Sequence, residues 1–306
     1  MIIIIKYICV WLIYYNIIYY NNIINMSLKY LRLGLTESTL LSFYWIELHH
    51  KLIDKQLSES KENLIKWLYT TSGYYDKTQI GNYMNVMHKN DDPIVYKKYM
   101  NLLLNFLHKA DILNIHFHGW NSPNNYLRNK FTDFLESKTQ HPINKDIIYN
   151  FIKDKKVLII SPFSPLMKQQ YDSGNLKKIY QDTPNVESIL TYKYPYTFFN
   201  NGPHNNILET CDHEFNQILN IYDINSYDNV IISCGAYSNL LAEKFYNLNK
   251  NVCTVGGDLQ GFFGIANKRT KDWNKNNFIN SEYWILDIPE EYKPDDYMKI
   301  ENGCYW

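Results

Sequence analysis

Residues 229–238, NVIISCGAYS, place a short apolar run directly before a turn of small residues and the start of a helical pattern. A run of this kind is typical of a strand that is buried on both faces of a parallel sheet. Because the turn leads straight into a helical pattern, the segment indicates the strand–turn–helix order of a βαβ unit.

Similar apolar runs and helical patterns alternate along the rest of the chain. The predicted strands are residues 28–33, 112–117, 157–163, 188–192, 230–233 and 252–255. The predicted helices are residues 39–52, 62–68, 93–109, 125–135, 145–153, 207–221 and 238–247. This order predicts an α/β fold, a Rossmann-like and mostly parallel sheet flanked by helices in a single domain. Residues 277–306 carry prolines and aromatic side chains, and we expect an irregular tail that lies over the domain.

The N-terminal residues 1–25 differ from the rest. They contain an apolar run, residues 2–20, which Lys6 and Asn16 interrupt, and no small-residue cleavage site follows it. Two hypotheses remain. The segment is an uncleaved membrane anchor, or it is an extension upstream of a working start at Met26. The second is favoured because the folded pattern, which we assign to residues 26–306, begins directly after Met26.

Charge and cysteine content exclude several classes of function. The 306 residues include 31 basic and 31 acidic side chains, so the formal net charge is zero and binding to a nucleic-acid backbone is disfavoured. The five cysteines are an odd set without CxxC spacing, which indicates neither a disulfide framework nor a thiolate zinc site. We therefore expect a reducing, cytoplasmic environment, with membrane association possible only through residues 1–25.

The end of the first predicted strand carries Arg32, Gly34 and Glu37. Ligands of open parallel sheets bind beyond the carboxyl ends of the strands, so these residues are candidates for a site. The Glu37 carboxylate can hold a metal ion or a sugar hydroxyl. The simpler alternative is that it complements the first turn of a helix. An arginine at a strand end is costly unless it is paired, which favours the functional interpretation.

The turn that contains Gly235, Ala236 and Tyr237 is a second candidate. Its backbone N–H groups and the positive end of the following helix suit a phosphate group. The turn lacks a full GxGxxG pattern, and a glycine here can also serve the geometry of the turn alone.

The last predicted strand leads into a third candidate, Gly256 and Gly257, with Gln260 shortly after. Close approach of a nucleotide to the backbone is the functional interpretation, and a plain turn is the alternative. Downstream, Lys268 and Arg269 can neutralise a diphosphate or form a solvated basic pair.

Two further strand ends carry polar residues. Ser161 begins the sequence SPFSP at the end of the third strand, and His116 and His118 share one face at the end of the second. No third zinc ligand stands at a suitable spacing, so the histidines are interpreted as polar groups of the cleft, or His116 as a catalytic base.

Several of these motifs together resemble bacterial and viral glycosyltransferases of the GT-D type. The resemblance rests on RLGLTE at 32–37, KADI at 109–112, CGA at 234–236, GGDLQGFFGI at 256–265 and the ending ENGCYW at 301–306. It covers residue 28 to the C-terminus, and its second half is the more specific.

The resemblance implies transfer of a hexose from a nucleotide-diphosphate sugar to a glycan acceptor, with Mn²⁺ or Mg²⁺ held near an Asp-x-Glu. Here the Asp position is Leu35, and only Glu37 remains as a metal ligand. Asp111 can replace the missing carboxylate only if its strand lies beside the first. Two other hypotheses stay open: a non-catalytic Rossmann-like binding or structural protein, and another group transfer on polysaccharide, such as pyruvylation.

Overall fold

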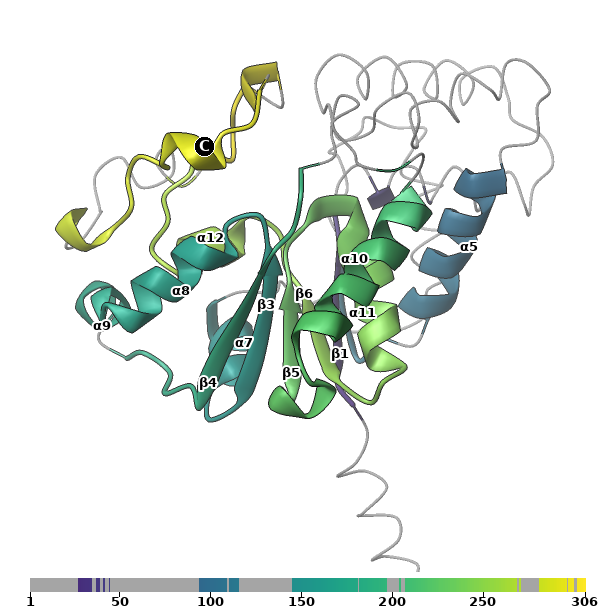
Figure 1. The fold of residues 1–306 in the computed structure, drawn as a ribbon, viewed down its shortest axis with the longest axis horizontal. Helices are drawn as coiled ribbons and strands as arrows, with labels where there is room; N and C mark the ends of the chain where they lie inside the picture. The colour runs from purple at the N-terminus through teal and green to yellow at the C-terminus, as the bar shows by residue number, and fades with distance from the viewer. Residues whose placement is uncertain are drawn as a thin grey trace, which may run out of the picture.

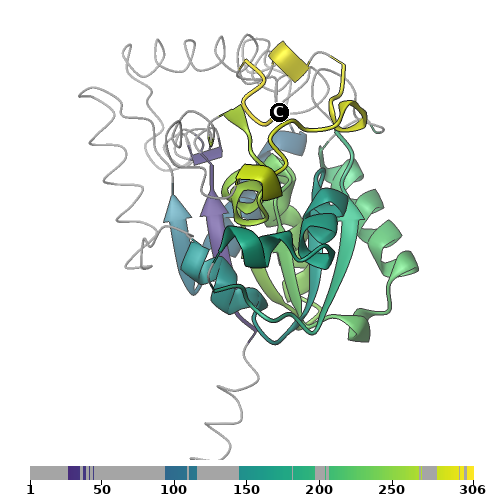
Figure 2. The same ribbon diagram turned by 90° about the vertical axis from the view of Figure 1, so that its left-hand side faces the viewer.

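A computed structural model describes a six-stranded sheet with helices on both faces (Figures 1 and 2). The described residues are 27–34, 37–38, 41, 44, 94–108, 110–115, 145–180, 182–196, 204, 207–268, 270, 281–295, 297–299 and 302–306. Within them the strands are β1 Lys29–Leu33, β2 Ile112–Ile115, β3 Lys156–Ser161, β4 Ser188–Lys193, β5 Asn229–Ile232 and β6 Asn251–Thr254. All six predicted strands are confirmed.

Every strand pair of the sheet is parallel, and the order across it is β2-β1-β6-β5-β3-β4. The central strands are buried on both faces. All four residues of β5 are buried, as are the last five of β3. Continuous burial of short apolar runs is the arrangement expected when helices cover both sides of a parallel sheet.

The helices divide between the two faces. They are α5 Ile94–Leu107, α7 Lys145–Ile152, α8 Ser164–Asp172, α9 Asn175–Ile179, α10 Ile207–Ile221, α11 Ser238–Tyr246 and α12 Asp258–Phe262. Short 3₁₀ turns are η2 Ile224–Ser226, η3 Gly235–Tyr237, η4 Ser281–Tyr283, η5 Glu290–Tyr292 and η6 Tyr297–Lys299. Helices α5, α10 and α11 share one hydrophobic core with the sheet, and α7, α8, α9 and α12 share the other. The Rossmann-like α/β class is thus confirmed.

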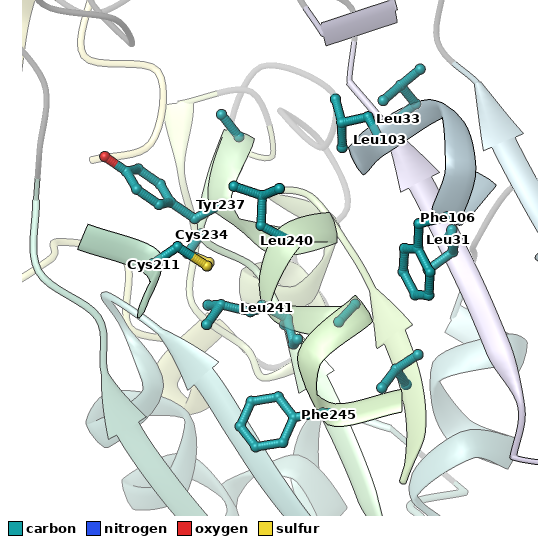
Figure 3. Close-up of a cluster of buried hydrophobic side chains, with 14 of the residues drawn as sticks. Leu31, Leu33, Leu103, Phe106, Cys211, Cys234, Tyr237, Leu240, Leu241 and Phe245 are labelled. Atoms are coloured by element: carbon teal, nitrogen blue, oxygen red, sulfur yellow. The ribbon is translucent and has the colours of Figure 1, made fainter. Parts of the chain in front are cut away.

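Helix α11 covers the sheet on the face that it shares with α5 and α10, above a buried hydrophobic cluster. Leu240, Leu241 and Phe245 of α11 lie in one buried cluster with Leu31 of β1 and Phe106 of α5 (Figure 3). Each of these side chains is buried. Burial of apolar area at roughly 25 cal/mol per Å² is the main stabilising term of such a layer.

Helices α8, α9 and α12 were not predicted from the sequence. Helix α8 begins immediately after Phe163 and has Pro165 in its first turn, where proline is tolerated because that N–H has no partner in the helix. The sequence SPFSP was interpreted as a strand end alone. It is a strand end followed by a helix start.

The C-terminal tail lies at the end of the molecule where β3 and β4 terminate (Figures 1 and 2). The Tyr292 carbonyl accepts hydrogen bonds from Tyr196 Oη at 2.8 Å and from Trp306 Nε1 at 2.7 Å. The Tyr292 ring also stacks on Phe163, with 6.4 Å between ring centroids. An irregular tail that lies over the domain was expected, and the described parts of residues 277–306 have this arrangement.

None of the helices in the described part of the chain combines the length and the hydropathy that a bilayer crossing requires. The predicted N-terminal extension, residues 1–25, lies outside the described residues, as do the predicted helices 62–68 and 125–135.

Candidate functional site

Three of the predicted strand ends are brought together at one edge of the sheet. Strand β6 lies between β1 and β5, so the residues that follow these three strands are neighbours. Beyond β1 and β5 the chain joins the face that holds α11, whereas beyond β6 it enters α12 on the opposite face. Open α/β sheets bind ligands at the place where the connections that follow neighbouring strands leave to opposite faces of the sheet.

Arg32, at the penultimate position of β1, reaches across to the end of β6. A Cβ placed on Gly256 would stand 2.5 Å from Arg32 Nη1 and 2.6 Å from Cζ. The guanidinium therefore occupies the space that any larger residue at position 256 would need. A Cβ at position 256 would have to displace the end of this long, flexible side chain. The sequence left two interpretations of this glycine open, close approach of a nucleotide and a plain turn, and the first stays a prediction.

Glu37 lies near the same arginine. A Cβ placed on Gly34 would clash with Glu37 Oε2, and it would stand 3.7 Å from Arg32 Nη1. The carboxylate belongs to a largely buried side chain, 8% exposed. The Ser38 N–H donates to the Gly34 carbonyl at 2.9 Å, so the chain turns tightly here and carries Glu37 back over the strand end.

A buried polar network fixes the backbone beneath the Arg32 side chain. Thr254 Oγ1 accepts a hydrogen bond from the Arg32 N–H at 2.7 Å and donates to Asn239 Oδ1 at 3.0 Å. The Asn239 amide Nδ2 in turn donates to the Arg32 carbonyl at 3.0 Å. Sequence reasoning missed both side chains. The signal was present, because a threonine ends the apolar run of β6 and an asparagine stands in the first turn of α11.

The guanidinium itself is only partly satisfied by the protein. Arg32 Nε is buried and has no hydrogen-bond partner within the part of the chain that the structure describes. A buried charged donor without a partner is costly, so an anion at this edge would supply the hydrogen-bond acceptor that Arg32 Nε lacks.

The Gly235 turn joins this arrangement through β5. Gly235 has φ of +60°, a left-handed conformation that residues with a Cβ rarely adopt. Ser233 Oγ donates to the Gly256 carbonyl at 3.1 Å, which ties the two turns together. The Ser238 hydroxyl accepts from the Cys234 N–H at 3.0 Å, so this backbone donor is already used within the turn.

Ala236 and Tyr237 belong to the core, although we expected them to contact a cofactor. Both are buried, and Tyr237 belongs to the cluster drawn in Figure 3. Its ring lies 5.2 Å from that of Tyr194, centroid to centroid. The Ala236 carbonyl accepts from Tyr99 Oη at 3.1 Å. These two residues therefore contribute only their backbone to the carboxyl edge of the sheet.

Asp111 was predicted as a possible replacement for the missing carboxylate, and this prediction is wrong. Strand β2 does lie beside β1, but Asp111 precedes β2 and stands level with the start of β1. Its Oδ2 accepts from the Lys29 N–H at 2.8 Å. In a parallel sheet the residue before a strand lies at the amino edge, opposite to Glu37.

Three other candidates have structural partners. Ser161 is buried, and its Oγ accepts from the Phe163 N–H at 3.2 Å within the turn into α8. Gln260 and Lys268 donate to carbonyls of the tail, those of Tyr305 at 3.1 Å and Asn302 at 3.2 Å. These hydrogen bonds tie both side chains to the tail, and their predicted contacts with a cofactor stay a prediction.

Two candidates cannot be placed. His116 and Arg269 lie outside the described residues, as does Leu35.

The described residues of this edge do not form a metal site by themselves. No group of three or more His, Cys, Asp or Glu side chains that could hold a metal occurs among the described residues. The metal-ligand role expected of Glu37 stays a prediction, and the Arg32 guanidinium beside this carboxylate would repel a cation.

Burial also raises the pKa of titratable groups around the site. Burial, followed by the charge of Glu37, raises the pKa of Tyr99 well above its ordinary value. Burial raises the pKa of the Cys234 thiol to about 12. A thiol with so high a pKa stays protonated at neutral pH, which disfavours a nucleophilic role for Cys234.

Comparison with known proteins gave no match: none was found among protein-family models, among curated proteins or among solved structures.

Proposed function

We propose that the chain is a glycosyltransferase that moves a sugar from a nucleotide-diphosphate donor to a glycan acceptor. The proposal is supported by one observation above all: Arg32 and Glu37 converge over Gly34 and Gly256 at the carboxyl edge of three neighbouring parallel strands. A fixed cation and a carboxylate at such an edge suit a donor phosphate and an acceptor hydroxyl, respectively.

Arg32 is assigned to the donor diphosphate. Guanidinium groups bind phosphate oxygens with two parallel hydrogen bonds, and these charge-assisted bonds are stronger than neutral ones. The orphaned Nε adds a donor that no protein acceptor uses in the described residues. We assign neutralisation of the leaving diphosphate to this guanidinium and route no step through a metal ion.

Glu37 is assigned as the general base. In the proposed step its carboxylate accepts the proton of the acceptor hydroxyl, the hydroxyl oxygen bonds to the anomeric carbon, and the bond from that carbon to the diphosphate breaks. The nucleoside diphosphate leaves with the bonding electron pair. Such a base must lie within hydrogen-bond reach of the proton it removes, about 2.6–3.2 Å.

The test is release of nucleoside diphosphate from nucleotide sugars in the presence of a mixed glycan acceptor, with and without Mn²⁺. We expect release by the wild-type chain, and loss of release in Glu37→Gln with donor binding retained. Absence of release with every donor, by a chain that binds a nucleotide sugar, would contradict the enzyme and favour the non-catalytic binding protein. The replacement of the Asp position by Leu35 is the observation that keeps this second function open.

A further inference from the structure

We propose that Tyr305, in the C-terminal tail, is the residue that recognises the base of a nucleoside diphosphate. The inference rests on the proposed donor site and adds the nucleoside half of the ligand to it. Neither the sequence motifs nor the resemblance assigned a role to this tyrosine.

The position of the tyrosine ring is defined by Gly257. Tyr305 Cε1 lies 3.7 Å from the point where a Cβ on Gly257 would stand. The preceding residue, Gly256, is the one that Arg32 covers. The guanidinium and the aromatic ring therefore flank two consecutive residues, whose Cα atoms are about 3.8 Å apart. One nucleoside diphosphate is long enough to contact both.

The tail is held firmly enough for this role. The amide of buried Gln260 donates to the Tyr305 carbonyl at 3.1 Å, and Lys268 donates to the Asn302 carbonyl. On its other side Trp306 is anchored by the hydrogen bond from its indole to the Tyr292 carbonyl. These bonds hold the backbone of Tyr305, and its side chain packs against the hydrophobic cluster that α7, α8, α9 and α12 share with the sheet.

The chemistry of the ring suits a base. Tyr305 is half-buried, and the Trp306 ring meets it edge-on at 5.9 Å between centroids. An aromatic face beside a phosphate-binding cation gives a base a stacking surface, and such stacking tolerates any base.

The experiment measures binding of UDP, ADP, GDP and inorganic pyrophosphate to the full chain by calorimetry. For the nucleotide that binds best, Tyr305→Ala should raise Kd at least about tenfold, while Tyr305→Phe, which keeps the ring, should change it less than about threefold. The Kd of pyrophosphate should be unchanged in both variants, because it carries no base. Tyr297→Ala is the matched control: it removes another tail tyrosine, which meets Trp306 edge-on, and should leave all four Kd values unchanged.

Two results would overturn the inference alone. One is a Tyr305→Ala protein that binds nucleotides as well as wild type, and the other is an equal loss of nucleotide and pyrophosphate binding. A wild-type chain that binds neither class of ligand would instead contradict the donor site, and with it both proposals.

Discussion

The guanidinium of Arg32 fills the space that a side chain on Gly256 would occupy, with Nη1 2.5 Å from the position of that missing Cβ. The two residues are far apart in sequence and meet because β1 and β6 are neighbours in the sheet. The contact leads to a sharp prediction, because the atoms that would clash belong to the flexible end of a long side chain.

Gly256→Ala should displace the Arg32 guanidinium while leaving the fold intact. We expect diphosphate binding to weaken about as much as in Arg32→Ala, roughly ten- to a hundredfold in Kd, the value of a charge-assisted hydrogen bond. The double variant should be no weaker than either single one, because both changes remove the same interaction. Calorimetry checks the Kd values and thermal unfolding checks the fold.

Gly257→Ala is the matched control for that experiment. A Cβ there would meet its neighbours at ordinary contact distances of 3.6–3.7 Å, and the residue has φ of −57°. Binding and stability should both stay close to wild type. Additive effects of Arg32→Ala and Gly256→Ala would show that the two positions act independently, contrary to the structure.

Glu37→Gln should abolish sugar transfer with little change in melting temperature, because the amide keeps the shape of the side chain but cannot accept a proton as a base does. Gly34→Ala should act on the same group, since its Cβ would push the Glu37 carboxylate away. Transfer assays beside melting curves check both. Stability lowered by about 0.5–2 kcal/mol with transfer intact would identify Glu37 as a helix-terminus residue and remove it from catalysis.

Thr254→Val should lower the free energy of unfolding by about 1–3 kcal/mol, because the Arg32 N–H and the Asn239 amide oxygen would each lose a buried partner. Thr254→Ser keeps the hydroxyl and is expected to lose less. Denaturant unfolding measures both changes. Equal losses in the two variants would mean that the methyl group, and not the polar network, stabilises this strand end.

The stability of the fold should decline in alkali. Burial raises the pKa of Cys234 from 9.0 and that of Tyr227 from 10.0, each to about 12. In the folded state these groups keep their protons while the unfolded chain loses them, so the unfolded state binds fewer protons and the free energy of unfolding falls as pH rises. The contribution is fully present below pH 9 and is lost between about pH 9 and 12. Unfolding curves across this range measure the loss.

Tyr227→Phe tests the contribution of one such group. The Tyr227 hydroxyl is buried and has no hydrogen-bond partner among the described residues. Its removal should leave stability at pH 7 unchanged or higher, and should make the alkaline loss smaller. A marked loss of stability at pH 7 would mean that the hydroxyl forms a stabilising hydrogen bond.

Most of the sheet could be predicted from the sequence, because buried parallel strands are short apolar runs with clear ends. Helix α10 was predicted with its observed bounds, since its apolar residues recur at a helical period. Helix α8 was missed because its mean hydropathy is low and prolines surround its start. The helical periodicity of apolar residues is weak in this segment, so contacts with the rest of the domain determine that it forms a helix.

The candidate site was predicted less completely. The three strand ends at Arg32, Gly235 and Gly256 were found because a parallel sheet collects its carboxyl ends at one edge. The contact of Arg32 with Gly256 depends on strand order, which the sequence does not reveal. The tail partners of Gln260 and Lys268 depend on a segment about forty residues further along, which no local pattern indicates.

The donor site at Arg32 is the central claim, and thermal unfolding of the wild-type and Arg32→Ala chains against a panel of nucleotide sugars tests it most directly. A ligand that binds only the native state raises the melting temperature. We predict that at least one nucleotide sugar stabilises the wild-type chain, with or without Mn²⁺, and that Arg32→Ala abolishes this shift while melting normally by itself. A stabilising donor whose shift is the same in both proteins, or no stabilisation by any donor, would contradict the account.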